Sequence, residues 1–252
     1  MSSAPVTIIT GSSRGIGRAA AELLARRGHR VVISSRNQES CEAVAEAIRS
    51  DGGEAQAIAC HVGDEDQRTA LVDQAVDRFG RLDHLVLNAA SNPVYGPSEA
   101  VEQDAFDVIM RNNVFGSLRL SHLAAGPIAE SGGGSIVLVS SIAGQLGNRV
   151  IGAYGMSKAA ENQLVRNLAL ELGGRRIRVN GVAPGLVRTD FSKALLSDDR
   201  AVKHFEQTTP LGRIAEPEDI ARVIAMLVSH DAGWVTGQVL VADGGITVTG
   251  GF

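Results

Sequence analysis

Cysteine, lysine and long apolar runs are all scarce in this sequence. Its 252 residues include two cysteines, Cys41 and Cys60, which are too few for a disulfide framework or a zinc site. We expect both to be small core residues in a reducing compartment. The longest uninterrupted apolar run covers residues 223–228, whereas a membrane-spanning helix needs about 20 apolar residues. We therefore expect no membrane partner.

Neither targeting signals nor excess positive charge are evident. Residues 1–4 lead directly into a strand-like segment, without the basic and apolar regions of a secretory signal. We therefore expect a cytoplasmic protein. The chain has 24 Lys and Arg against 28 Asp and Glu, a formal net charge of −4, which argues against nucleic acid as its partner.

What the sequence does contain is a regular alternation of two patterns. Short β-branched runs, typical of buried strands, alternate with segments of helical periodicity. The strands are expected at 6–10, 30–34, 55–60, 85–87, 135–139, 177–183 and 239–241, and the helices at 16–27, 39–49, 64–79, 102–130, 153–172 and 216–228. Such an alternation predicts βαβ units. We expect residues 1–252 to form a single doubly wound Rossmann domain, with a parallel seven-stranded sheet and helices on both faces.

Residues 184–215 interrupt this alternation. They form a long polar stretch without a predicted strand. Loops of this length in a compact domain are usually lids or binding segments, so we expect a substrate-binding loop here.

A glycine-rich turn follows the first predicted strand. Gly11, Gly15 and Gly17 occur within seven residues, in the spacing G-x-x-x-G-x-G. Glycine allows the tight turn, the approach of the backbone to a pyrophosphate and close helix–strand contact. A turn that merely connects strand to helix is the alternative. The pattern favours a dinucleotide site formed by the turn residues Gly11, Ser13, Arg14, Gly15, Ile16 and Gly17.

The end of the second predicted strand bears on which dinucleotide binds. An NAD site usually has an acidic residue about 20 residues after the glycines, where it binds the ribose 2′-hydroxyl. Here the strand ends with Ser35 and Arg36, and the first acid is Glu39. Arg36 and Arg14 are suited to a 2′-phosphate, although both can equally be solvated surface charges. We expect NADP, with NAD as the alternative.

Two rare residue types coincide on one predicted helix. Tyr154 and Lys158 are four residues apart and so share a face, in a chain with only two tyrosines. An ammonium near a phenol lowers the pKa of the phenol, which makes a tunable proton donor or acceptor. Ser141 follows the fifth predicted strand, where its hydroxyl can donate to a carbonyl oxygen.

Together these motifs resemble the short-chain dehydrogenase/reductase family over about residues 6–245, in particular its 3-oxoacyl-reductase-like branch. The resemblance adds four further motifs, at Asn88-Ala89-Ala90, at Asn113 with the following Val-Phe-Gly, at 184–189 and at 237–245. Ala90 departs from the family's glycine. His61 stands where many members have an aspartate that binds the adenine amine, so adenine contacts are expected to rest more on Val62.

The resemblance implies a role for each of these residues. Tyr154 would be the acid in reduction and the base in oxidation, Lys158 would lower the pKa of Tyr154 and hold the nicotinamide ribose, and Ser141 would polarise the substrate carbonyl. Asn113 would hold a water in a proton relay with Lys158, and no metal is needed. The implied cofactor contacts are residues 11 and 13–17, Arg36, His61, Val62, Asn88, Ala89, Ala90, Tyr154, Lys158, Pro184, Gly185, Val187 and Thr189.

The expected function is NADP(H)-dependent interconversion of a carbonyl group and a secondary alcohol, of the ketone or 3-oxoacyl reductase type. Two alternatives remain: an NAD-dependent dehydrogenase of a sugar, polyol or steroid alcohol, and a dinucleotide sensor without turnover. The resemblance also implies a homotetramer or homodimer. The sequence does not identify the small-molecule substrate or the direction of the reaction. Trp234 is expected to pack the last helix–strand connection.

Overall fold

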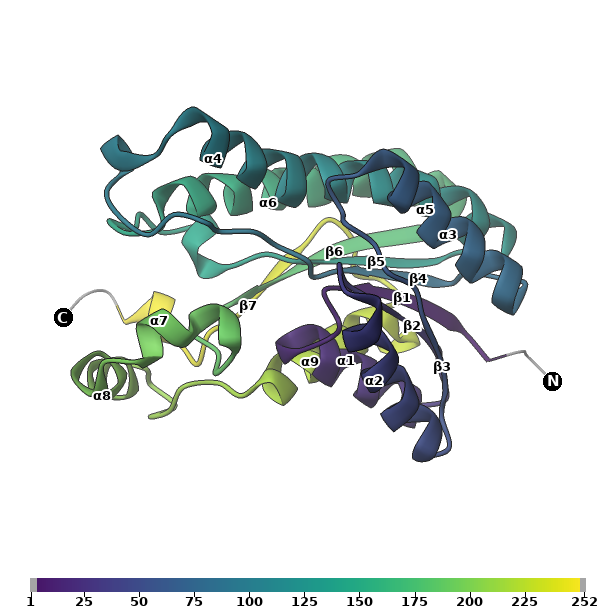
Figure 1. The fold of residues 1–252 in the computed structure, drawn as a ribbon, viewed down its shortest axis with the longest axis horizontal. Coiled ribbons are helices and arrows are strands. Elements are labelled where there is room, and N and C mark those ends of the chain that lie inside the picture. Colours follow the sequence, from purple (N-terminus) through teal and green to yellow (C-terminus); the bar gives the residue numbers. More distant parts are fainter. Residues whose placement is uncertain (1–3, 250–252) are drawn as a thin grey trace.

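A single parallel sheet of seven strands organises the chain in the computed structural model, which describes residues 4–249 (Figure 1). The strands are β1 (Val6–Thr10), β2 (Arg30–Ser34), β3 (Glu54–Ala57), β4 (His84–Leu87), β5 (Gly134–Val139), β6 (Ile177–Pro184) and β7 (Val239–Ala242). Their order is β3-β2-β1-β4-β5-β6-β7, so the direction in which strands are added reverses between β1 and β4. The expected Rossmann-like architecture is confirmed, and its switch point lies beside the glycine-rich turn.

Helices cover both faces of the sheet (Figure 1). One layer contains α1 (Gly15–Arg26), α2 (Gln38–Ser50) and α9 (Pro217–Val228), and the other contains α3 (Glu65–Phe79), α4 (Gln103–Ile109), α5 (Gly116–Glu130) and α6 (Gly152–Leu172). Two short helices, α7 (Lys193–Leu196) and α8 (Asp199–Thr208), lie beyond the carboxyl ends of the strands. No helix within residues 4–249 is long and apolar enough to cross a bilayer.

Two apolar cores hold the layers to the sheet. Because successive side chains of a strand point to opposite faces, Ile9 of β1 packs in the core below α1 and α9, whereas Ile8 packs in the core below α3, α5 and α6. Cys41 and Cys60 are free and buried, one in each core. The strands are therefore fixed in register, and their carboxyl ends meet at one edge of the sheet.

The expected helix over 102–130 is divided into three parts. Between α4 and α5 the chain forms a π-helical segment, Met110–Phe115, in which Asn112 and Asn113 are buried. Periodicity does not indicate this change, since the apolar pattern continues through it. Segments of this kind occur frequently at functional sites.

Two further expectations need correction. The regular part of β3 ends at Ala57, three residues before the expected end of that strand, although the N–H groups of Ile58 and Cys60 still donate to carbonyls of the β2 side. Trp234 does not pack the last helix–strand connection, because its side chain is fully exposed.

Residues 184–215 contain α7, α8 and one isolated bridge between Val187 and Ala215. The prediction that the chain lacks a secretory signal was made from residues 1–4, and residues 1–3 lie outside the described residues.

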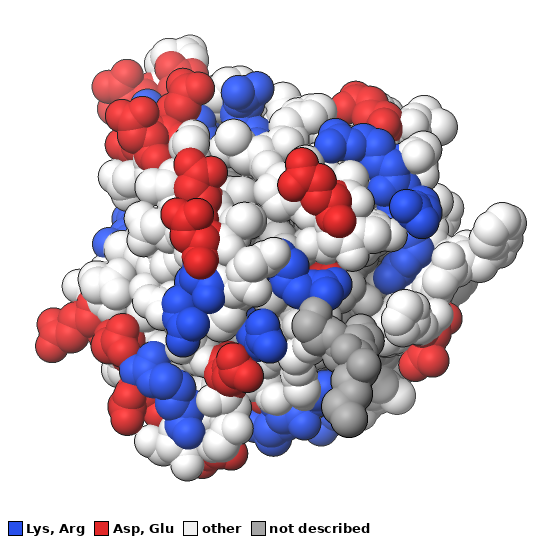
Figure 2. All heavy atoms as spheres, turned by 90° about the vertical axis from the view of Figure 1, so that its right-hand side faces the viewer, with Lys and Arg blue, Asp and Glu red and all other residues white. Residues whose placement is uncertain are grey.

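The face at the amino ends of the strands lies away from the glycine-rich turn. Basic and acidic side chains are interspersed over it (Figure 2), as the small net charge of the whole chain leads one to expect. That nucleic acid is not a partner stays a prediction.

Candidate active site

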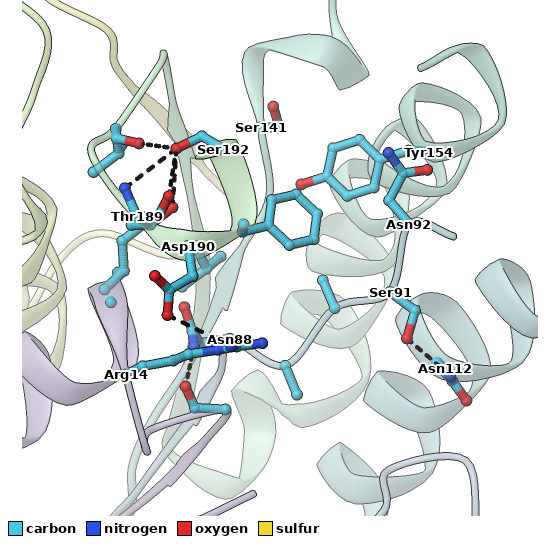
Figure 3. A pocket seen from close by; sticks show the side chains of 18 of the residues that line it. Arg14, Asn88, Ser91, Asn92, Asn112, Ser141, Tyr154, Thr189, Asp190 and Ser192 are labelled. Carbon is cyan, nitrogen blue, oxygen red and sulfur yellow. Dashed lines mark hydrogen bonds and ion pairs between the residues drawn. The ribbon is translucent and has the colours of Figure 1, made fainter. Parts of the chain in front are cut away.

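A cavity of about 530 Å³ opens at the carboxyl ends of the strands. All of the predicted site residues except Gly17 and Asn113 line it. The glycine-rich turn forms one end, and Tyr154 and Ser141 lie at the other (Figure 3). The fold thus gathers into one cavity side chains that are far apart in the sequence.

The glycine-rich turn needs glycine for two reasons. Gly11 and Gly15 have φ angles of 65° and 56°, in the left-handed region that other residues rarely adopt. Gly17 does not line the cavity; a Cβ atom there would lie 2.5 Å from both Nδ2 of Asn88 and the Gly11 carbonyl oxygen. Gly17 therefore allows α1 to approach β4, and a direct contact of Gly17 with the cofactor stays a prediction.

The side chain of Asn88 ties this turn to β4. Its Nδ2 donates to the carbonyl oxygens of Thr10 and Gly11, at 3.0 Å each. The N–H groups of Asn88 and Ala89 donate to Oγ1 of Thr10, each at 3.1 Å. These four bonds fix the backbone of the turn relative to the neighbouring strand.

The amino end of α1 fits a phosphate. Its N-cap, Arg14, makes no side-chain capping bond, and the first turn contains no acidic residue. The first N–H groups of a helix lack partners within the helix, and its dipole favours an anion at this end. The turn, the cavity that continues from it and the cations beside it together suit a nicotinamide dinucleotide.

The two predicted phosphate-binding arginines lie in different surroundings. Arg36 is exposed at the end of β2, and no described residue pairs with it. Arg14 is exposed too, but its Nη1 lies 3.5 Å from Oδ2 of Asp190 (Figure 3). Asp190 follows β6 and was not predicted as a site residue.

His61 and Val62 line the cavity beyond β3. The Nδ1 atom of His61 accepts a bond of 3.0 Å from the N–H of Gly63, so the ring closes a local turn. The Cβ position of Gly63 would lie 2.9 Å from this ring, which explains the glycine. Adenine contact by His61 and Val62 stays a prediction.

Two elements, β5 and α6, position the residues expected to do the chemistry. Ser141 follows β5, and its Oγ accepts from the N–H of Ala143 at 3.1 Å. Tyr154 lies in the first turn of α6, where its ring packs on Phe191 with 5.6 Å between the ring centroids. Lys158 follows one turn later with its Nζ 5.4 Å from the centroid of the Tyr154 ring. A donor, a phenol and an ammonium thus share one wall of the cavity.

Lys158 is buried, with 1% of its side chain exposed. Its Nζ donates to the carbonyl oxygen of Val139 at 2.9 Å and to Oε2 of Glu161 at 2.8 Å. An ammonium has three donors, so one N–H remains for a ligand. Glu161 was not predicted as a site residue. Its position three residues after Lys158 on a predicted helix could have indicated the pair, because side chains at this spacing are neighbours.

The pKa of Tyr154 is higher than that of a free tyrosine. Burial raises it most, the Lys158 ammonium lowers it, and the Glu161 carboxylate raises it again. A hydrogen bond with Ser141 also lowers it. The expected effect of Lys158 therefore operates, but it does not determine the net direction.

Asn113 lies behind the cavity wall with none of its surface exposed. Its Oδ1 accepts from the N–H of Ser91 at 2.8 Å, and its Nδ2 donates to the Ser91 carbonyl at 3.1 Å and to Oγ of Ser157 at 3.0 Å. The neighbouring Asn112 donates to Oγ of Ser91 (Figure 3). Both asparagines thus hold the segment after β4, while a relay through Asn113 stays a prediction.

Comparison with known protein families agrees with this architecture. The model of a family described as enoyl-(acyl carrier protein) reductase matches residues 11–247. Dehydrogenase/reductase SDR family member 4 of Oryctolagus cuniculus is 39% identical over 240 residues, which are 95% of this chain and 92% of that protein. Dehydrogenase/reductase SDR family member 2, mitochondrial, of Homo sapiens is 40% identical over 95% of this chain and 85% of its own length.

Solved structures agree as well. A gluconate 5-dehydrogenase from Burkholderia cenocepacia J2315, in complex with NADP and tartrate, superposes with a TM-score of 0.93 at 31% identity, over 97% of this chain and 96% of the other. A 7α-hydroxysteroid dehydrogenase in complex with NADH and 7-oxo glycochenodeoxycholic acid superposes with a TM-score of 0.92 at 37% identity, over 96% of this chain and 93% of the other. The two neighbours carry different nicotinamide dinucleotides.

Proposed function

Since the chain belongs to the short-chain dehydrogenase/reductase family, we propose that it is an NADP(H)-dependent oxidoreductase that interconverts a carbonyl compound and a secondary alcohol. The observation that carries this proposal is the single cavity shared by the glycine-rich turn, Arg36, Ser141, Tyr154 and Lys158. A dinucleotide-binding protein without turnover has no need for the last three together. We assign the reaction to one catalytic domain formed by the whole chain.

The cofactor assignment rests on charge. Arg36 is free of any described partner, and a guanidinium binds a phosphate through two parallel hydrogen bonds. Arg14 lines the same cavity and adds a second cation. We therefore assign NADP rather than NAD, with the phosphates of the dinucleotide placed at the amino end of α1.

The chain's own residues would act as follows on a bound substrate. Ser141 donates a hydrogen bond to the carbonyl oxygen, and Tyr154 supplies the proton that this oxygen takes up in reduction. Lys158 directs its free N–H toward the cofactor ribose and stabilises the phenolate that remains. Pro184, Gly185, Val187 and Thr189 enclose the nicotinamide end of the cavity. The dinucleotide, when bound, supplies or accepts the hydride at its nicotinamide ring.

The part of the cavity proposed for the substrate is lined by segments that match none of the sequence motifs. Ser91 and Asn92 after β4, Tyr95, Ile151 before α6, and Leu186 and Phe191 after β6 form this part of the cavity. Their mixed character suits a small molecule with an apolar body and polar groups. We propose that residues 184–215 form the substrate-binding loop.

One alternative function has specific support. The similar 7α-hydroxysteroid dehydrogenase was solved with NADH, which favours an NAD-dependent dehydrogenase of a steroid, sugar or polyol alcohol. The absence of an acid at positions 35 and 36 argues against it, because such an acid would bind the ribose 2′-hydroxyl.

We also propose a homotetramer. The side chains of Trp234 and Leu170 are 100% and 87% exposed, and a partner subunit would cover such large apolar groups.

We propose a cytoplasmic location as well, although one relative is named as mitochondrial.

Binding and turnover measurements test the main proposal. NADPH and NADH are titrated into the purified protein while the fluorescence of the nucleotide is recorded. Oxidation of each is then followed by absorbance with ketones, 3-oxoacyl thioesters and sugars. Tighter binding of NADPH, with turnover on a carbonyl compound, supports the proposal. Tighter binding of NADH favours the alternative dehydrogenase, and dinucleotide binding without turnover on any panel compound contradicts the enzyme proposal for these substrate classes.

A further inference from the structure

A carboxylate is buried against the ammonium that lies beside the proposed acid. Glu161 of α6 has 2% of its side chain exposed, and its Oε2 lies 2.8 Å from Nζ of Lys158. A buried charge is costly unless it is paired and hydrogen-bonded. The pair of Lys158 and Glu161 meets that condition. Lys158 lies one turn after Tyr154 on the same helix, so the charges of this pair act on the phenol of Tyr154.

We propose that Glu161 is a positioning residue that keeps the phenol of Tyr154 protonated, and so sets the pH at which carbonyl reduction begins to fall and alcohol oxidation reaches its maximum. This inference rests on the proposed role of Tyr154 as the acid. Glu161 does not line the cavity, so it acts through Lys158 rather than by contact with the substrate.

The link between Glu161 and Tyr154 is electrostatic. The ammonium of Lys158, 5.4 Å from the centroid of the Tyr154 ring, stabilises the phenolate when its charge is unopposed. The carboxylate of Glu161 places a negative charge against that ammonium, so the pair as a whole presents little net charge to Tyr154. Consistent with this, Glu161 raises the pKa of Tyr154, while Lys158 lowers it.

The carboxylate is present where it is needed. Burial raises the pKa of Glu161 to about 7, with Lys158 opposing the rise. Tyr154 loses its proton only well above that pH, because its own pKa is raised from 10.0. Glu161 is therefore ionised throughout the range in which Tyr154 titrates.

No second charged group competes with Lys158 for Glu161 among residues 4–249. Lys158 is the one charged side chain that changes the pKa of Glu161. The other ionisable groups on the elements packed against this helix do not contribute; they are Asp104 and Asp107 on α4, Arg111 in the π-helical segment, Arg119, His122 and Glu130 on α5, Arg175 in the short helix Gly173–Arg175, and Arg178 on β6.

The small number of tyrosines makes a direct test possible. The chain has two, Tyr95 and Tyr154, so in a Tyr95→Phe background the ultraviolet absorbance of tyrosinate reports Tyr154 alone. Rapid pH jumps on this background give the pKa of Tyr154 without cofactor or substrate. Glu161→Gln is expected to lower that pKa by about one to three units, as removal of a nearby like charge does.

Activity provides the second measurement. The pH profile of kcat/KM for alcohol oxidation should level off at a correspondingly lower pH in Glu161→Gln. The profile for carbonyl reduction should begin to fall at the same lower pH, because reduction needs the protonated phenol. A residue that only supports the helix would change stability and rate without moving the profile.

Two matched variants separate charge from packing. Glu161→Asp retains the charge and should keep the Tyr154 pKa near that of the parent. Glu171→Gln removes the same charge from an exposed position on the same helix, where its one ion pair within residues 4–249 is with His122, and should change neither measurement. An unchanged or raised Tyr154 pKa in Glu161→Gln would overturn the proposal. If no substrate is ever turned over, the titration still decides the role of Glu161 while the proposed function fails separately.

Discussion

The Nη1 atom of Arg14 lies 3.5 Å from Oδ2 of Asp190 and joins the glycine-rich turn to the segment after β6. Both side chains are about two-thirds exposed, at 68% and 65%. The same guanidinium is one of the two proposed for the 2′-phosphate of NADP. Asp190 is therefore placed to compete with that phosphate for Arg14.

Asp190→Asn should strengthen NADPH binding. The substitution removes a carboxylate that repels the phosphate and draws Arg14 away from it. Because exposed ion pairs contribute only about 0.2–1 kcal/mol, we expect a gain of up to about fivefold in NADPH affinity that diminishes with added salt. Fluorescence titration at low and high salt measures it. Equal gains for NADPH and NADH would show that Asp190 acts on something other than the 2′-phosphate.

Arg36→Asp should reverse the cofactor preference. The new carboxylate repels the 2′-phosphate and can accept a bond from the 2′-hydroxyl of NADH. A charge-assisted bond is worth about 1.5–3 kcal/mol, so the NADPH/NADH ratio of kcat/KM should fall by at least about tenfold. NADH kinetics in the same variant serve as the internal control. A ratio that does not change removes the basis for assigning NADP.

Tyr154→Phe should abolish turnover but retain cofactor binding. Without the phenol no group on this wall donates the proton, and general acids contribute about 100- to 10,000-fold to rates. Tyr95→Phe is the matched control, since it removes the only other phenol from the same cavity. Near-normal kcat in Tyr154→Phe, or an equal loss in both variants, contradicts the proposed role.

His84 should make the fold sensitive to mild acid. Burial, and then the neighbouring His29, lower the pKa of His84 to about 3, below the ordinary 6.5 that it has in the unfolded chain. The folded protein therefore favours the neutral ring. The stability that results is fully present above about pH 6.5 and is lost as the pH falls toward 3. Between about pH 6.5 and 5 this amounts to about 2 kcal/mol for one group.

The test compares urea unfolding of His84→Gln with that of the parent at about pH 7 and about pH 5. The variant should lose less stability on acidification, because one protonation site has been removed from the unfolded state. His122→Gln, at a position where the side chain is 40% exposed, should behave as the parent does. The same acid sensitivity in all three proteins would assign the effect to other groups.

The fold was predictable because its local patterns agree with one another. Runs such as Val6–Thr10 are buried throughout, and their alternation with amphipathic helices leaves few arrangements besides a parallel sheet. The π-helical segment Met110–Phe115 was not predictable in this way. Within it, Asn112 and Asn113 bond to Ser91 after β4, and no local sequence pattern encodes that contact.

The candidate site was predictable where a motif has a fixed spacing, as in the glycine-rich turn or the pair Tyr154 and Lys158. It was not predictable where function depends on a contact across the fold. Asp190 reaches Arg14 across 176 positions of sequence, and no local pattern encodes that. Glu161 was missed because an acid three residues from a lysine is usually a surface pair, and its burial is known only from the packing of α6.

The bonds from Asn88 to Thr10 and Gly11 span 78 and 77 positions of the chain. A ribosome must therefore release the whole segment through β4 before the glycine-rich turn acquires its final shape. Until then the nascent chain offers no ordered cradle for a phosphate. Ligand then stabilises the completed molecule over its unfolded form, to a degree set by ligand concentration relative to the dissociation constant. We expect the lifetime of this protein in a cell to follow the supply of its dinucleotide, so that a scarcity of cofactor lowers its abundance as well as its rate.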